Sequence, residues 1–150
     1  STLHTNDCPS TIARLVDMGI PSFLVSSALL LIVAQRLGRR VCPDCRQPIP
    51  GEESDLVPYG HVPTGTGRCT FYKGKGCATC NFTGMKGRVA IYEVMPVTPD
   101  LREMILRGAP TADIRELARG QGMKTLRQAG LMKVLEGVTT VEEVLRVTVA

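Results

Sequence analysis

Two short stretches of the sequence, "VCPDC" at residues 41–45 and "KGCATCNFTG" at residues 75–84, each contain a Cys-x-x-Cys pair. A tight turn lets both thiolates of such a pair point to one place. Four thiolates about 2.3 Å from one ion form the closed tetrahedral site that structural Zn²⁺ adopts in proteins. The sequence therefore predicts a structural zinc site with four ligands: Cys42, Cys45, Cys77 and Cys80.

Other interpretations of these cysteines stay open from the sequence. Two disulfides fit poorly, because no secretory signal is visible and disulfides belong to oxidising compartments. An iron–sulfur centre or unliganded thiols are further alternatives. Cys8 and Cys69 are left over, and Cys69 or His61 could replace one of the four ligands.

The basic residues gather around the cysteines. Residues 36–90 contain nine Lys and Arg against four Asp and Glu, within a chain whose net charge is only +4. Zn²⁺ with four thiolates carries a net charge of −2, which nearby cations would offset. The candidates nearest in sequence are Arg40, Arg46, Lys75, Lys86 and Arg88.

The composition predicts a folded chain of one ordinary domain or two small ones. Of its 150 residues 43% are hydrophobic and 4% aromatic, so the core should be mostly aliphatic. The mild positive charge permits an acidic partner but does not by itself indicate nucleic-acid binding.

The segments before the first cysteine pair predict helices. Residues 1–5 are typical of a strand end, and Asp7, Pro9 and Gly19 delimit a helix over about residues 8–18. The apolar run "FLVSSALLLIVAQRL" at residues 23–37 predicts a buried core helix between Pro21 and Gly38. That run is shorter than the roughly 20 apolar residues that a membrane span requires.

Later segments alternate between irregular, strand and helix patterns. Residues 43–67 are rich in Pro and Gly and predict no regular element, whereas residues 68–72 and 88–94 predict strands. Four short helices should begin at the threonines 98, 111, 125 and 140 and pack as one bundle. The predicted fold class is α+β and mainly helical, with a short antiparallel β ribbon in the cysteine region and a small C-terminal helical bundle.

Catalytic patterns are weak in this chain. No phosphate-binding loop, zinc-protease motif or Ser-His-Asp pattern occurs, and "GTGR" and "GKGC" match no such motif. The sequence opens on "STLHTND" without Met, which predicts a piece cut from a longer protein. We expect this chain alone to turn over no substrate.

Several motifs in order resemble one family. The stretches "STLHTNDCPSTIARLVDMGI", "LIVAQRLGRRVCPDC", "GCATCNFTGMKGR" and "LMKVLEGVTTVEEVLRVT" are similar to the hexameric ATPases that drive type II secretion and type IV pilus assembly. The resemblance implies that residues 1–37 end a RecA-like ATPase core. Residues 38–95 would then form the tetracysteine zinc module, and residues 96–150 a helical subdomain. Pilus retraction ATPases lack these four cysteines, so the resemblance favours pilus extension or secretion.

The resemblance also implies a site and partners. "LHTN" matches the family's His box, which would place His4 near the γ-phosphate of ATP, with ATP and Mg²⁺ bound only by the full-length protein. The implied partners are neighbouring subunits of a homohexamer and the inner-membrane platform and accessory proteins. The protein would be cytoplasmic, peripheral to the inner membrane and without a transmembrane segment. Residues 1–37 should expose apolar surface that would normally pack on the rest of the core.

Two other functions are consistent with a zinc module. One is a zinc-ribbon nucleic-acid-binding module, in which the basic residues act with aromatic side chains that stack on bases. The aromatic candidates are Phe71, Tyr72, Phe82 and Tyr92. The other is a purely structural zinc domain. The ordered family motifs favour the motor ATPase over both, and no nucleic-acid partner is expected.

Overall fold

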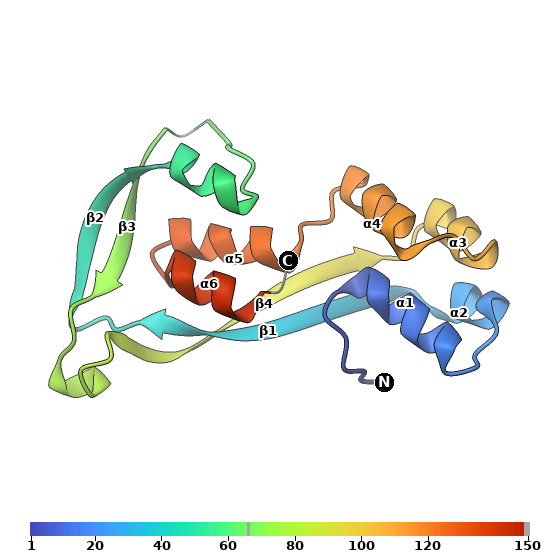
Figure 1. Cartoon of the computed structure of the whole chain (residues 1–150), viewed down its shortest axis with the longest axis horizontal. Helices are drawn as coiled ribbons and strands as arrows, with labels where there is room; N and C mark the ends of the chain where they lie inside the picture. The colour runs from blue at the N-terminus through green and yellow to red at the C-terminus, as the bar shows by residue number, and fades with distance from the viewer. Residues whose placement is uncertain (66, 149–150) are drawn as a thin grey trace. The chain divides into compact units, whose positions relative to one another are not determined.

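The computed structural model describes residues 1–65 and 67–148, which form an α+β fold (Figure 1). The chain divides into two compact units: residues 1–34 with 92–125, and residues 35–91 with the chain from residue 126 onward. The divisions fall within two strands, β1 (Leu31–Val41) and β4 (Met85–Pro96), which pair as a two-stranded sheet. We describe each unit separately.

Four helices make up most of the first unit: α1 (Cys8–Asp17), α2 (Ser22–Ala28), α3 (Pro99–Leu106) and α4 (Thr111–Gly120). Helix α1 packs on α4, and α2 packs on α3. Asp7 caps α1 as predicted, since its carboxylate accepts a 2.8 Å hydrogen bond from the backbone N–H of Ser10. The same carboxylate forms a 2.7 Å ion pair with Arg115 of α4 and so ties the two helices together.

The prediction of a long helix between Pro21 and Gly38 is wrong. Helix α2 ends at Ala28, and the second half of the apolar run is strand β1. Ile32 and Ala34 are buried whereas Leu31 and Val33 are exposed, which is the two-residue period of a strand. An unbroken apolar run hides this alternation, because both faces of the strand carry hydrophobic side chains.

The prediction of a single C-terminal bundle is also wrong. Helices α3 and α4 belong to the first unit, whereas α5 (Leu126–Leu135) and α6 (Val141–Val147) belong to the second. The caps were predicted better than the packing. Thr98 accepts a hydrogen bond from the N–H of Leu101, and Thr140 accepts one from the N–H of Glu143. At the other end of the chain, residues 1–5 form no strand.

Regular structure fills much of the segment that was predicted to have none. Strand β2 (Arg46–Glu52) pairs antiparallel with β3 (Arg68–Gly74), in a register that runs from Arg46 opposite Gly74 to Glu52 opposite Arg68. A 3-10 helix, η1 (Glu53–Tyr59), follows β2 directly. Strands were correctly predicted near residues 68–72 and 88–94, but each pairs with an earlier strand that the sequence did not reveal.

A small aliphatic core holds the second unit together. Leu56 of η1 packs with Leu131 and Val134 of α5 and with Val144 of α6. Phe71 of β3 is partly buried against this cluster. Helices α5 and α6 approach closely at Gly130, where an added Cβ would lie 2.7 Å from a methyl carbon of Val144. The predicted aliphatic core is confirmed, and it includes a residue from the Pro- and Gly-rich middle of the chain.

The predicted apolar surface within residues 1–37 is present. Eight large hydrophobic side chains of this segment are exposed: Val16, Met18, Phe23, Leu24, Leu30, Leu31, Val33 and Leu37. Within the part of the chain that the structure describes, no helix combines the length and the hydrophobicity that crossing a bilayer demands.

Candidate metal centre

The first cysteine turn begins where β1 ends. The backbone N–H of Val41 donates to the carbonyl of Val138, and that of Cys42 donates to the carbonyl of Gly84, both at 2.9 Å. These two successive backbone hydrogen bonds fix the path of the chain where it leaves β1, and Cys42 is fully buried at this point. Cys45 closes the turn just before β2 begins.

The second turn follows β3 and includes a short 3-10 helix, η2 (Ala78–Cys80). The carbonyl of Cys77 accepts hydrogen bonds from the N–H of Cys80 at 3.2 Å and of Phe82 at 2.8 Å. The N–H of Lys75 donates to the carbonyl of Cys45 at 3.1 Å and so links the second turn to the first. The two turns are therefore placed against each other by the backbone as well as by any ion they hold.

Four sulfur atoms meet between these turns. The sulfurs of Cys42, Cys45, Cys77 and Cys80 all lie within 4.8 Å of one another. Three of the sulfur–sulfur distances are 3.8 Å: 42 to 77, 45 to 80, and 77 to 80. A tetrahedron with sulfurs about 2.3 Å from its centre has edges of about 3.8 Å, so these positions fit a tetrathiolate Zn²⁺ site.

The same distances contradict the disulfide interpretation. A disulfide needs sulfurs about 2.05 Å apart, and all six cysteines are free. With four protein ligands the site has no open position, which is the arrangement of a structural rather than a catalytic zinc.

Backbone N–H groups point at the sulfurs. Gly76 donates to Cys45 at 3.3 Å, and Cys77 and Gly84 donate to Cys80 at 3.3 and 3.2 Å. Burial alone would raise the pKa of Cys80, but these two N–H groups and the neighbouring thiols outweigh it and lower that pKa to about 6. The surroundings of Cys80 therefore favour its thiolate, which is the form that binds a metal.

Close backbone contacts near the cysteines require glycine at several positions. These contacts were not predicted from the sequence. A Cβ on Gly74 would lie 2.0 Å from the carbonyl oxygen of Gly84. Gly76 has a φ of +102°, and a Cβ there would lie 3.0 Å from the carbonyl oxygen of Phe82. The repeated glycines in "KGKGCATCNFTG" were the available signal, since backbone can approach sulfur closely only where side chains are small.

Of the predicted charge-compensating residues, Lys86 has a contact with a cysteine turn. Its ammonium donates at 3.0 Å to the carbonyl of Thr79, between Cys77 and Cys80. The guanidinium of Arg46 instead lies over the ring of Tyr72, 4.5 Å from its centroid. Lys86 therefore places one positive charge on the turn that carries Cys77 and Cys80.

The other candidate ligands lie elsewhere. His61 is buried and its Nε2 lies 2.7 Å from a carboxylate oxygen of Glu53. Cys69 pairs with Gly51 on the β2–β3 ribbon. Cys8 is fully buried in the first unit, where its thiol lies 3.2 Å from the carbonyl of Glu93, and desolvation and the charge of Glu93 raise its pKa to about 12. None of these three side chains belongs to the sulfur cluster of the described residues.

His4 is exposed in the irregular segment before α1. Its role near the γ-phosphate of ATP stays a prediction.

Comparison with known proteins identifies the family of this chain. The family described as "Type II/IV secretion system protein" matches residues 1–146. The "Type IV pilus assembly ATPase PilB" of Myxococcus xanthus is 49% identical over 96% of this chain, and the protein of the same name from Thermus thermophilus is 44% identical over 99%. The "Type II secretion system protein E" of Pseudomonas aeruginosa is 43% identical over 99% of the chain.

The matched region is a minor part of each relative. The chain covers 26% of the Myxococcus protein, 17% of the Thermus protein and 29% of the Pseudomonas protein. Because the family match extends along almost the entire chain, we conclude that this chain belongs to the type II/IV secretion system protein family.

Proposed function

We propose that this chain is the C-terminal region of a motor ATPase that powers type IV pilus assembly or type II protein secretion. The observation that carries the proposal is the family match over residues 1–146, with relatives named for both processes. The identities to the two groups, 49% and 43%, are too similar to choose between pilus assembly and secretion.

In this proposal the cysteine cluster holds a structural Zn²⁺ that stiffens the module around it. The donor set supports this role, because four thiolates in tetrahedral positions leave no site for a substrate or a water. The ion joins two turns that are distant in the sequence, so that β1, β3 and β4 keep fixed directions where they enter and leave the site. A rigid module of this kind can transmit a subunit movement without bending.

We further propose that residues 1–37 complete a RecA-like ATPase core and that residues 38–95 form the zinc module, followed by a helical region, residues 96–150, whose helices divide between the two units. The exposed apolar side chains of residues 1–37 support this division, because they need a partner surface to leave water. ATP and Mg²⁺ bind only to the full-length protein. His4 then contributes a hydrogen-bonding side chain near the γ-phosphate, and the isolated chain is inactive.

The complete protein acts, in this proposal, as a cytoplasmic homohexamer peripheral to the inner membrane. ATP hydrolysis moves its subunits, and these movements do work on an inner-membrane platform protein and its accessory proteins. The names of the relatives, a pilus assembly ATPase and a secretion system protein, support the role in pilus assembly or secretion.

The test uses the full-length protein and its ATPase rate in the presence of purified platform protein. We expect one zinc per subunit by mass spectrometry, and loss of both zinc and platform-stimulated activity in the Cys42→Ser, Cys77→Ser double variant. Cys69→Ser is the matched control and should keep both. His4→Gln should reduce the turnover number with little change in zinc content or hexamer formation.

Two results would contradict the proposal. A double variant that loses zinc but keeps full stimulation would show that the metal centre has no part in the motor. Absence of ATPase activity in the full-length protein under all of these conditions would contradict the proposed motor function.

The nucleic-acid alternative loses part of its support in the structure. Phe71 packs against the core, and Tyr72 lies between Arg46 and the backbone at Gly137, where an added Cβ would be 2.7 Å from the ring. Phe82, which is 77% exposed, and Tyr92, which is 51% exposed, remain available for stacking. Binding of single-stranded DNA or RNA with a steep salt dependence would favour this alternative.

A further inference from the structure

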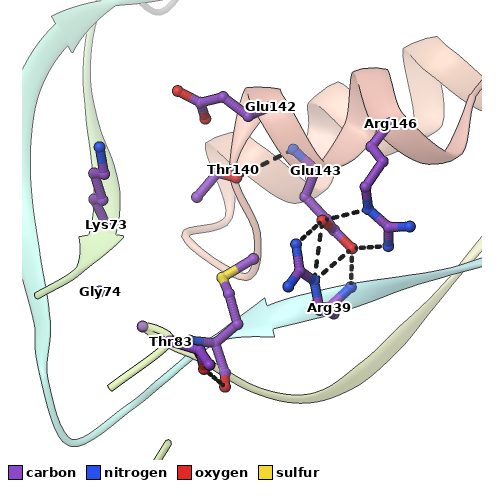
Figure 2. A pocket seen from close by; sticks show the side chains of 10 residues that line it. Arg39, Lys73, Gly74, Thr83, Thr140, Glu142, Glu143 and Arg146 are labelled. Carbon is purple, nitrogen blue, oxygen red and sulfur yellow. Dashed lines mark hydrogen bonds and ion pairs between the residues drawn. The ribbon is translucent and has the colours of Figure 1, made fainter. Parts of the chain in front are cut away.

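A hollow of about 290 Å³ opens on the second unit, between β1, the end of β3, the start of β4 and helix α6 (Figure 2). Five charged residues line it: Arg39, Lys73, Glu142, Glu143 and Arg146. All belong to one compact unit, and none is a predicted metal ligand. The site just described does not use this hollow.

One buried carboxylate fixes the two arginines of the hollow. The side chain of Glu143 is only 2% exposed, and it accepts hydrogen bonds from the Nε and Nη2 groups of both Arg39 and Arg146. A further 2.8 Å bond from the backbone N–H of Arg39 holds the carboxylate in place. Figure 2 shows the two guanidinium groups on either side of the Glu143 carboxylate. Their positions are therefore set before any ligand arrives, which lowers the entropic cost of binding.

The arginines keep donors for a ligand. Their side chains are 51% and 56% exposed, so each presents its outer edge to solvent. Among the residues that the structure describes, the Nη1 groups of Arg39 and Arg146 and the ammonium of Lys73 make no hydrogen bond or ion pair. Glu142 is directed away from the arginines in Figure 2. The hollow thus offers unused N–H donors from three cations.

The charge balance limits the kind of ligand. Three cations and two carboxylates leave the lining with a net charge of +1. One carboxylate would neutralise it, whereas a phosphate carrying nearly two charges would leave an excess negative charge near Glu142. Guanidinium groups also match the planar geometry of a carboxylate.

We propose that this hollow binds an aspartate or glutamate side chain presented by an acidic segment of a partner protein. The hollow is open to solvent, so a side chain that projects from a partner's surface can enter it. The basic surroundings of the second unit attract such a segment at longer range. This inference goes beyond the proposed motor function and does not depend on it.

The test is an NMR titration of the purified 150-residue chain with a blocked Gly-Asp-Gly peptide up to ~20 mM, a range suited to weak binding. We expect saturable shifts in the amide signals of residues 39, 73 and 146, and weaker binding when NaCl rises from ~50 to ~500 mM. A blocked Gly-Asn-Gly peptide, which has the same shape without the charge, should produce no saturable shift. Inorganic phosphate is titrated in parallel as the competing ligand.

Three charge variants distinguish this hollow from general electrostatic attraction. Lys73→Gln should weaken binding of the Asp peptide about three- to fivefold, because it removes one unpaired cation. Glu142→Gln should strengthen binding, since it removes a negative charge from the lining. Arg107→Gln makes the same change in net charge as Lys73→Gln but alters an exposed residue of the first unit, and it should leave the affinity unchanged.

Neither Lys73 nor Glu142 is buried, so these variants should fold, which chemical shifts outside the hollow will verify. The proposal is overturned if the Asp peptide gives no saturable shift, or if the Asn peptide binds equally. It is also overturned if Lys73→Gln and Arg107→Gln have the same effect. Tighter binding of phosphate than of the Asp peptide would assign the hollow to a phosphorylated ligand instead.

Discussion

Two neighbouring regions of the second unit, both poor in hydrophobic residues, become ordered in different ways. The cysteine turns, residues 42–45 and 76–84, bring together four sulfurs that could hold a metal ion. The segment 46–65 between them in the sequence forms β2 and η1 and places Leu56, only 1% exposed, in the aliphatic core. In the proposed zinc module the first region depends on the metal, whereas the second folds through its own side chains.

A buried carboxylate anchors the second region. Glu53 is 1% exposed, and one of its oxygens lies 2.7 Å from His61 Nε2, 2.8 Å from the backbone N of Thr64 and 3.0 Å from its hydroxyl. The N–H of Glu53 also donates to the carbonyl of Gly67 at 2.8 Å. One acidic residue thus provides the hydrogen-bond acceptor for His61 and Thr64 in the loop after η1. This Pro- and Gly-rich segment therefore has an anchor of its own that does not involve the metal.

Removal of the metal should have the largest effect. Structural zinc contributes about 10–16 kcal/mol of binding energy in zinc-finger peptides, so we expect Cys77→Ser or chelation to destabilise the turns by more than about 5 kcal/mol. Hydrogen exchange should show lost protection at residues 76–84, with residues 46–65 still protected. Cys69→Ser, outside the cluster, should have no such effect. Equal loss of protection in both regions would show that they do not order independently.

Truncation of Leu56 should act mainly on the other region. Leu56→Ala leaves a cavity against α5 and α6 and should lower the free energy of unfolding by about 2–5 kcal/mol. The measurement is urea denaturation, with zinc content determined on the same sample. Leu56→Met, which nearly conserves volume, should cost less than about 1.5 kcal/mol. Loss of zinc from the folded Leu56→Ala variant would contradict the separation of the two regions.

Removal of the Glu53 carboxylate should lower the free energy of unfolding by about 3 kcal/mol, because His61 and Thr64 would lose a buried hydrogen-bond acceptor. Protection from hydrogen exchange should fall at residues 60–65 before it falls elsewhere. Glu53→Ala makes this change, and Thr64→Val, which removes only the hydroxyl donor, should cost about 1 kcal/mol. Equal destabilisation by the two variants would show that Glu53 does not anchor the loop.

Acid titration should give the smallest effect and involves neither region. The hydrogen bonds from Arg146, together with Arg39, outweigh desolvation and lower the pKa of Glu143 to about 2 from its usual 4.5. Because the folded pKa is the lower one, the stabilisation is complete above pH 4.5 and is lost as the pH falls towards 2. Because the two arginines are half exposed and solvent screens their charges, we expect this stabilisation to be only about 1–2 kcal/mol.

The measurement compares the unfolding free energy of the wild type with that of Glu143→Gln at pH 6, 4 and 3. The difference between the two proteins should shrink as the pH falls. A constant difference over this range would mean that Glu143 is not held ionised by the arginines.

Local chemistry explains which features were predictable. The caps at Asp7, Thr98 and Thr140 act within three residues, so the sequence reveals them. The cysteine cluster was predicted for a similar reason, because each Cys-x-x-Cys turn is a local unit whose ligand chemistry requires a second. Strand β2 and helix η1 were missed, because their stability comes from β3 and from the core rather than from their own composition.

The sequence by itself determined the aliphatic character of the core, the helix starts and the four cysteines whose sulfurs converge. Only the tertiary structure decided that residues 31–41 form a strand, that the last four helices divide between two units, and that Arg39 meets Arg146 across Glu143. The physical reason is how far apart in the sequence the interacting residues lie. Caps and turns depend on neighbouring residues, whereas strand β2 pairs with residues 16 to 28 positions away and the Glu143 carboxylate meets Arg39, 104 positions away. The approach of these distant residues is set by the packing of the whole unit.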